Sequence, residues 1–167
     1  MNPIPQPLPP NEKCNSSMQL TRGADYAVRV MIYLATLPEE QRALLPDLAL
    51  ATEAPESFLS KVLQSLAHAK LIVSRRGKAG GFAILPHGRE ASMRQVIEAI
   101  DGPICLNVCL NGSKDCDRKP TCPAHPVWAR AQRVMLEVLM SATVSTMAAR
   151  ASSTPASALP PAVPGVY

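Results

Sequence analysis

Aromatic residues and long apolar runs are what this sequence has least of. Only 4% of its 167 residues are aromatic although 47% are hydrophobic, so we expect an aliphatic and mainly helical core. No run of 18 apolar residues occurs, so no membrane span is expected. The first residues lack a basic region followed by an apolar core, so we expect no signal peptide and a cytoplasmic protein.

Signatures of catalysis are missing as well. No Ser–His–acid pattern, no paired acids and no phosphate-binding loop stands out, because Gly80-Gly81 opens a predicted strand rather than a helix. His68 and His87 are interpreted as surface or packing residues. We therefore predict that the protein is not an enzyme, with an iron–sulfur enzyme or electron carrier as the alternative from another class.

What the sequence does have is a cluster of cysteines, four of the five lying between Cys105 and His125. Cys109, Cys116 and Cys122 are separated by six and five residues, many of them Asn, Gly, Asp, Lys or Pro, which predicts a loop. Thiolates gathered by a loop suit zinc or an iron–sulfur cluster. Structural zinc usually brings Cys-x-x-Cys pairs and a disulfide needs an oxidising compartment, so the wide spacing favours a cluster.

Residues 18–103 are predicted to form a winged helix-turn-helix domain. One helix is expected from Thr21, a helix-turn-helix from Leu44 to Lys70, and a β-hairpin with a basic, glycine-rich tip from Leu71 to Leu85. A capping box at Ser92 predicts a further short helix.

Basic residues are concentrated in this domain. Between Pro55 and Arg89 there are six Lys or Arg and one acid, a local field that suits a polyanion such as double-stranded DNA. Short polar and basic side chains on a helix read base edges, and arginine enters narrow minor grooves. The predicted DNA contacts are Ser57, Ser60, Lys61, Gln64, Arg75, Arg76 and Lys78.

After the cysteine-rich loop, residues 104–125, we predict one long helix over residues 126–150 that serves for homodimerisation. Its apolar face exceeds what one small domain needs to cover. That face comprises Val127, Ala131, Val134, Met135, Val138, Leu139 and Ala142. Residues 1–17 and 151–167 are rich in proline and are predicted to be disordered tails. The expected fold is thus mainly α with a small β-hairpin wing.

This order of features resembles the IscR/NsrR family of bacterial regulators, which are dimeric winged-helix proteins, many of which sense through an iron–sulfur cluster. The resemblance covers about Met18 to Met147. Four segments carry it: the opening Met18–Arg29, the predicted recognition helix Ser57–Leu63, the wing Arg75–Phe82, and Cys122–Trp128 at the end of the loop.

The resemblance implies that Cys109, Cys116 and Cys122 bind the cluster. The first gap has six residues where some members have five, and Cys105 matches no ligand position. His125 matches the histidine ligand of IscR-like members. Asp25 matches an aspartate of some NsrR-like members, which the partner subunit contributes. We favour His125 as the fourth ligand because it needs no second chain, and [2Fe–2S] over [4Fe–4S].

The function that the resemblance implies is that of a homodimeric repressor. It would bind an operator in double-stranded DNA and sense redox state, nitric oxide or iron and cluster status. The alternative keeps the same DNA-binding domain but makes the metal site structural zinc.

Overall fold

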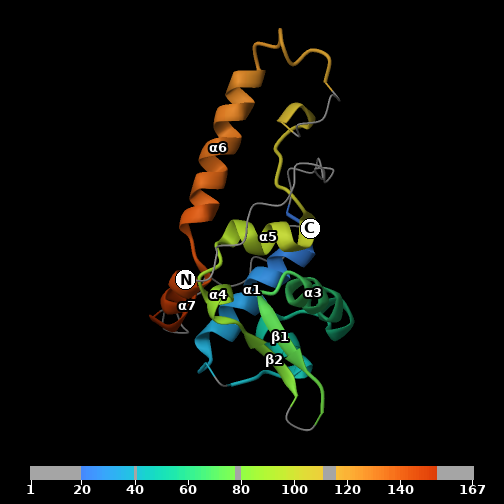
Figure 1. The fold of residues 1–167 in the computed structure, drawn as a ribbon, viewed down its shortest axis with the longest axis vertical. Coiled ribbons are helices and arrows are strands. Elements are labelled where there is room, and N and C mark those ends of the chain that lie inside the picture. Colours follow the sequence, from blue (N-terminus) through green and yellow to red (C-terminus); the bar gives the residue numbers. More distant parts are fainter. Residues whose placement is uncertain (1–19, 40, 78–79, 111–115, 154–167) are drawn as a thin grey trace.

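The computed structural model describes residues 20–39, 41–77, 80–110 and 116–153, and shows a mainly helical chain with one antiparallel hairpin (Figure 1). In chain order the elements are α1 (Arg22–Thr36), α2 (Leu45–Thr52), α3 (Glu56–His68), β1 (Ile72–Arg75), β2 (Gly81–Ile84), α4 (Pro86–Arg89), α5 (Met93–Asp101), the 3₁₀ turn η1 (Val108–Leu110), α6 (His125–Ser141) and α7 (Val144–Ser153). The predicted fold class is confirmed. None of these described helices is long and apolar enough to cross a membrane.

Helix α1 is the centre of the domain and is held at its start by two side chains. The Thr21 hydroxyl accepts a hydrogen bond from the Ala24 N–H at 3.2 Å, which caps the helix. The Asp101 carboxylate, at the end of α5, accepts from the Thr21 N–H at 3.1 Å and from its hydroxyl at 2.6 Å. The ends of α1 and α5 are thereby fixed to one another.

Helices α2 and α3 form the predicted helix-turn-helix. The Leu44 N–H donates to the Asp47 carboxylate at the start of α2, and Glu53, with φ of 54°, ends that helix in a left-handed conformation. Helix α3 buries its apolar face against α1. The buried residues of α3 are Leu59, Val62, Leu63 and Leu66.

The hairpin is the predicted wing, with Ile72 opposite Ile84 and Arg75 opposite Gly81. Ala43 extends it, because its N–H and C=O each pair with Phe82 at 2.9 Å. Gly81 has φ of +121°, and a Cβ there would lie 2.7 Å from the Ala43 oxygen. Glycine is required at this position because of both its conformation and this close approach.

Arg89, which is counted in the predicted basic field, is half-buried and bonded to the domain's own backbone. Its guanidinium donates to the Ala35 oxygen at 2.7 Å and to the Leu37 oxygen at 2.9 Å. These carbonyls lie at the C-terminal end of α1, where the helix has no further N–H groups of its own to offer. Arg89 therefore caps α1 from α4, a short helix that the sequence did not predict.

The predicted single helix over residues 126–150 is two helices. Between them, the Ala142 oxygen accepts from the Met93 N–H at 2.8 Å, and the Val144 N–H donates to the Ala91 oxygen at 2.9 Å. This pairing with the start of α5 requires extended backbone, which interrupts the helix. Helix α7 then packs on α1 and buries Val144, while α6 leaves the domain and buries none of its residues (Figure 1).

The predicted disordered tails lie almost wholly outside the described residues. Residues 1–17 are all outside them, and of residues 151–167 only 151–153 are described, as the last residues of α7.

Candidate functional site

The outer face of α3 is polar, as predicted. Ser57, Lys61 and Gln64 are exposed on it, and Ser60 is half-buried. The Ser60 hydroxyl donates to the Glu56 oxygen at 3.0 Å, so only its acceptor capacity is left for another molecule. With the leucines of α3 facing the core, this face is available for a groove of DNA.

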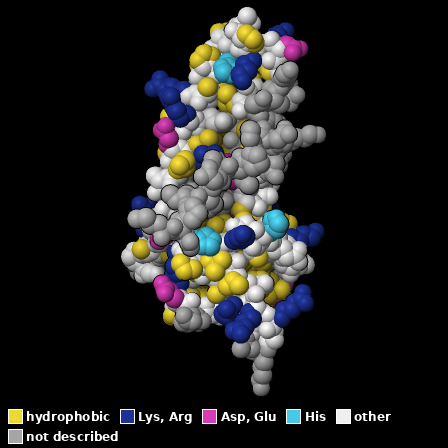
Figure 2. Space-filling model, viewed as in Figure 1, with side chains coloured by type: hydrophobic (Ala, Val, Ile, Leu, Met, Phe, Trp, Pro, Cys, Tyr) yellow, Lys and Arg dark blue, Asp and Glu magenta, His cyan; other side chains and the backbone are white. Residues whose placement is uncertain are grey.

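The wing supplies the basic part of the predicted interface. Arg75 and Arg76 are exposed at the tip end of the hairpin, whereas Lys78 lies outside the described residues. Figure 2 shows Lys and Arg side chains at the end of the molecule where the wing lies, and others near the start of α6 at the opposite end (Figures 1 and 2). The exposed arginines of the wing favour phosphate contacts at the hairpin end.

The three predicted cysteine ligands are free thiols that differ in exposure. Cys109 lies in η1 with 8% of its surface exposed, and Cys116 and Cys122 are half-buried. Cys105 is buried as well but is not among these free thiols. Within the described ranges, no group of three or more His, Cys, Asp or Glu side chains is placed to hold a metal ion. The predicted ligands are therefore not gathered around one centre in this structure.

His125 is the one predicted ligand with an unusual environment. It is the first residue of α6, and its N–H donates to the Cys122 oxygen at 3.2 Å. Its Nε2 atom is buried and has no hydrogen-bond partner among the residues that the structure describes. A buried polar atom without a partner is costly. Three soft thiols and an unsatisfied imidazole nitrogen therefore fit a metal centre by their chemistry, although the loop would have to close to bring them together.

Asp25 lies elsewhere in the protomer. Its carboxylate forms an ion pair with Arg29 at 2.9 Å on the surface of α1, with 53% of its side chain exposed. It is not grouped with the cysteines in the described part of the chain. Its role as a ligand stays a prediction that needs a second subunit.

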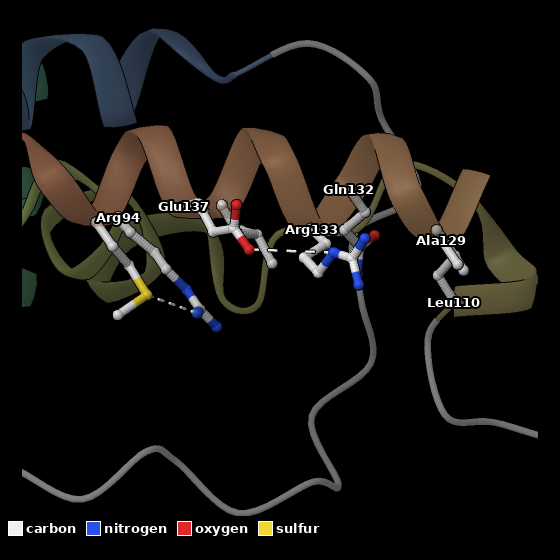
Figure 3. A pocket seen from close by; sticks show the side chains of 8 residues that line it. Arg94, Leu110, Ala129, Gln132, Arg133 and Glu137 are labelled. Carbon is white, nitrogen blue, oxygen red and sulfur yellow. Dashed lines mark hydrogen bonds and ion pairs between the residues drawn. The ribbon is translucent and has the colours of Figure 1, made fainter. Parts of the chain in front are cut away.

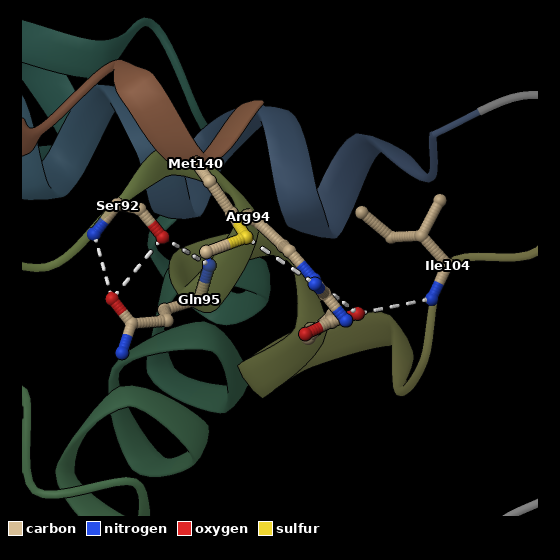
Figure 4. A network of polar contacts seen from close by, with 6 residues as sticks. Ser92, Arg94, Gln95, Ile104 and Met140 are labelled. Atoms are coloured by element: carbon tan, nitrogen blue, oxygen red, sulfur yellow. Dashed lines mark hydrogen bonds and ion pairs between the residues drawn. The ribbon is translucent and has the colours of Figure 1, made fainter. Parts of the chain in front are cut away.

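A polar network that the sequence did not predict connects residues 104–125, here called the cysteine segment, to the winged-helix domain (Figure 4). Arg94 pairs with Glu98 at 3.0 Å and donates to the Met140 sulfur at 3.5 Å. The Ile104 N–H donates to Glu98 at 3.4 Å, and the Leu106 N–H donates to the Gln132 side-chain oxygen at 2.9 Å. The spacing of Arg94 and Glu98 could have revealed their pair, but no local pattern marks Gln132.

Next to this network lies an open pocket of about 380 Å³, lined by residues of η1, α5 and α6 (Figure 3). Arg94 and Leu110 form one side, and α6 forms the other along Ala129 to Met140. The pocket shows that the cysteine segment and α6 lie beside each other without filling the space between them.

Comparisons with known proteins agree with this architecture. The model of the Rrf2 family, described as "Iron-dependent Transcriptional regulator", matches residues 20–150. An HTH-type transcriptional regulator of Mycobacterium tuberculosis is 34% identical over 78% of this chain and 81% of its own length. The regulator NsrR of Geobacillus kaustophilus is 28% identical over 78% of this chain and 89% of its own.

Solved structures show the same fold. The global cysteine regulator CymR of B. subtilis has a TM-score of 0.65 at 24% identity, covering 80% of this chain and 98% of its own. IscR of T. potens has a TM-score of 0.64 at 23% identity, covering 83% and 93%. The Mycobacterium and Geobacillus relatives are named as transcriptional regulators, not as enzymes.

Proposed function

Because this chain belongs to the Rrf2 family of transcriptional regulators, we propose that it is a cytoplasmic, homodimeric repressor whose operator affinity depends on an iron–sulfur cluster held by its cysteine segment. The signal is redox state, nitric oxide or iron status. The observation that carries the cluster is the buried Nε2 of His125, which has no hydrogen-bond partner in the described part of the chain and follows three free thiols in the sequence.

The proposed ligands are Cys109, Cys116, Cys122 and His125, with Asp25 of a second subunit as the alternative to His125. A cluster, with [2Fe–2S] favoured over [4Fe–4S], would supply a redox-active charge at this position. The imidazole is a weaker ligand for iron than a thiolate and is open to protonation, so the fourth position is the one we expect to be lost first. The relatives named NsrR and IscR support an iron–sulfur cluster. CymR, by contrast, is named as a global cysteine regulator.

The proposed dimer uses the exposed side of α6. Val127, Val134 and Val138 are 67%, 48% and 62% exposed and lie one or two turns apart on one face. Exposed apolar stripes of this kind mark interfaces between proteins. Met140, on the opposite side of α6, faces Arg94 of the chain's own domain.

The decisive experiment is anaerobic purification followed by an absorption spectrum and counts of iron, labile sulfide and zinc. We expect a coloured protein with iron and sulfide, which Cys109→Ser, Cys116→Ser or Cys122→Ser abolishes and His125→Ala weakens. Cys105→Ser changes a cysteine outside the proposed ligand set and should retain both. A colourless protein with stoichiometric zinc would favour the structural zinc site. A protein that stays metal-free after cluster reconstitution would overturn the proposal.

DNA contact by the wing is tested separately. Replacing Arg76 by Ala should weaken operator binding about tenfold and lower the slope of log affinity against log salt by about one, because one phosphate contact is lost. Arg133→Ala removes the same charge from α6, where its partner Glu137 is 4.0 Å away on the surface. An equal effect of both substitutions would contradict the wing assignment.

A further inference from the structure

The stretch between α5 and Cys109 is held by side chains of two different helices. The Ile104 N–H donates to Glu98 of α5 at 3.4 Å, and the Leu106 N–H donates to Gln132 of α6 at 2.9 Å. We call Glu98 and Gln132 the two-acceptor clamp. Because the acceptors belong to different helices, this stretch can satisfy both N–H groups only while α5 and α6 keep their relative position.

Gln132 links the two ends of the cysteine segment, namely the residues before Cys109 and the start of α6. Leu106, whose N–H donates to the Gln132 side chain, lies three residues before Cys109. Gln132 itself lies about two turns after His125 on α6. Its hydrogen bond therefore connects the residues before Cys109, the most buried of the three free thiols, to the helix that begins with His125, whose Nε2 has no partner among the described residues.

Glu98 connects the same stretch to the DNA-binding domain. Its side chain is only 19% exposed and also pairs with Arg94, which reaches Met140 near the end of α6 (Figure 4). Helix α5 buries Val96 in the core, packs on α1 and α3, and binds Thr21, the N-cap residue of α1, through Asp101. A displacement of α5 would therefore change the position of α3, the predicted recognition helix.

We propose that Glu98 and Gln132 are positioning residues that pass a change in the cysteine segment to α5, and through α5 to α1 and α3. The proposal rests on the proposed function in one respect, namely that the cysteine segment has two states. If the cysteine segment moves when the cluster changes, at least one of the Ile104 and Leu106 N–H groups loses its acceptor. Helices α5 and α6 then shift until both N–H groups are hydrogen-bonded again.

The first test uses the full chain without metal and measures amide hydrogen exchange. Gln132→Ala should speed exchange in residues 104–110 about tenfold, since it removes the acceptor of the Leu106 N–H, and Glu98→Ala should do the same around Ile104. Gln132→Glu and Glu98→Gln keep an acceptor oxygen and should restore protection. Glu137→Ala is the matched control on α6 and should change nothing. Unchanged exchange in both alanine variants would overturn the clamp.

The second test measures the ratio of DNA affinities of the iron-loaded and the iron-free protein. Gln132→Ala and Glu98→Ala should bring this ratio to within about twofold of one, while iron and sulfide content stay as in the wild type. Gln132→Glu, Glu98→Gln and Glu137→Ala should keep the wild-type ratio. An unchanged ratio in both alanine variants, with iron bound, would overturn the coupling role alone.

The two proposals fail in distinguishable ways. If the wild type binds neither iron nor sulfide, the proposed function fails, and so does the coupling that presupposes it. The hydrogen-exchange test would then still decide whether the clamp holds the segment. If the wild type binds the cluster and its affinity ratio differs from one, the alanine variants decide the coupling by themselves.

Discussion

Helix α3 has 13 residues and buries four apolar side chains, whereas α6 has 17 residues and buries none. Both helices have apolar residues at helical spacing, and the difference lies in what each has to pack against. Among the described elements, α3 contacts α1, α2 and α5, while α6 contacts only α5 and η1 appreciably. Amphipathic spacing thus predicts a face, and the fold decides whether that face is core or interface.

In the proposed dimer, stability and assembly would therefore depend on different parts of the chain. The winged-helix domain has its own aliphatic core, which extends from α1 to α7 and includes Val30, Leu63, Ile97 and Val144. Helix α6 adds little to that core beyond the partly buried Leu139. Substitutions in the domain should lower the free energy of unfolding, and substitutions on the free face of α6 should lower that of association.

The largest expected effect on folding is at Leu63, which is 1% exposed in α3. Leu63→Ala should lower the free energy of unfolding by about 3 kcal/mol, because it removes buried methyl groups and leaves a cavity. Urea denaturation followed by circular dichroism measures this. Leu50→Ala is the same change at a residue that is 84% exposed, and it should cost less than about 0.5 kcal/mol. Equal costs would remove the distinction between core and surface.

The next effect concerns the free face of α6. Val134→Asp combined with Val138→Asp should weaken self-association by at least about 2 kcal/mol, roughly thirtyfold, because each charge would be buried between two copies. Sedimentation equilibrium measures the dimer dissociation constant. Met140→Asp, on the opposite side of the helix and 55% exposed, should leave it nearly unchanged. A wild type that stays monomeric would refute the dimer proposal.

A smaller effect is expected where α5 meets α1. Asp101→Ala removes the acceptor of two hydrogen bonds from Thr21 and should cost about 1 kcal/mol of unfolding free energy. Thr21→Ser keeps the hydroxyl and should retain most of the stability. If thermal unfolding of Asp101→Ala matched that of the wild type, the contact between the two helix ends would contribute nothing.

The smallest effect is expected at Asp25. Asp25→Ala breaks an exposed ion pair with Arg29, and such pairs contribute less than about 1 kcal/mol. Iron content gives a second measurement on the same variant. Wild-type iron content would exclude Asp25 as the fourth ligand, and loss of iron in Asp25→Ala but not in His125→Ala would assign that role to Asp25.

Much of the winged-helix domain was predictable because its signals are local. The capping box at Ser92, the glycine-rich hairpin and the leucine spacing of α3 each fix structure within a few residues. The polar face of α3 followed from the same spacing, since the residues opposite a buried stripe are exposed.

What could not be predicted depends on contacts between distant residues. No Pro or Gly marks the break at Ala142, which is caused by backbone pairing with Ala91 and Met93 some fifty residues earlier. The capping role of Arg89 has no local signal either, because its two acceptors lie more than fifty residues away. The burial of His125 Nε2 likewise has no signature in the sequence.

The return of the chain at α7 has a consequence for how the protein is built. The chain leaves the domain after Asp101, at the end of α5, and returns to it at Ala142, beside the start of α5. The two points are therefore separated by only the length of that helix, about 12 Å. The cysteine segment and α6 are therefore an insertion in a closed domain rather than an extension of its end. A segment inserted in this way can be replaced by one of different chemistry, while the DNA-binding domain keeps both of its covalent connections and its core.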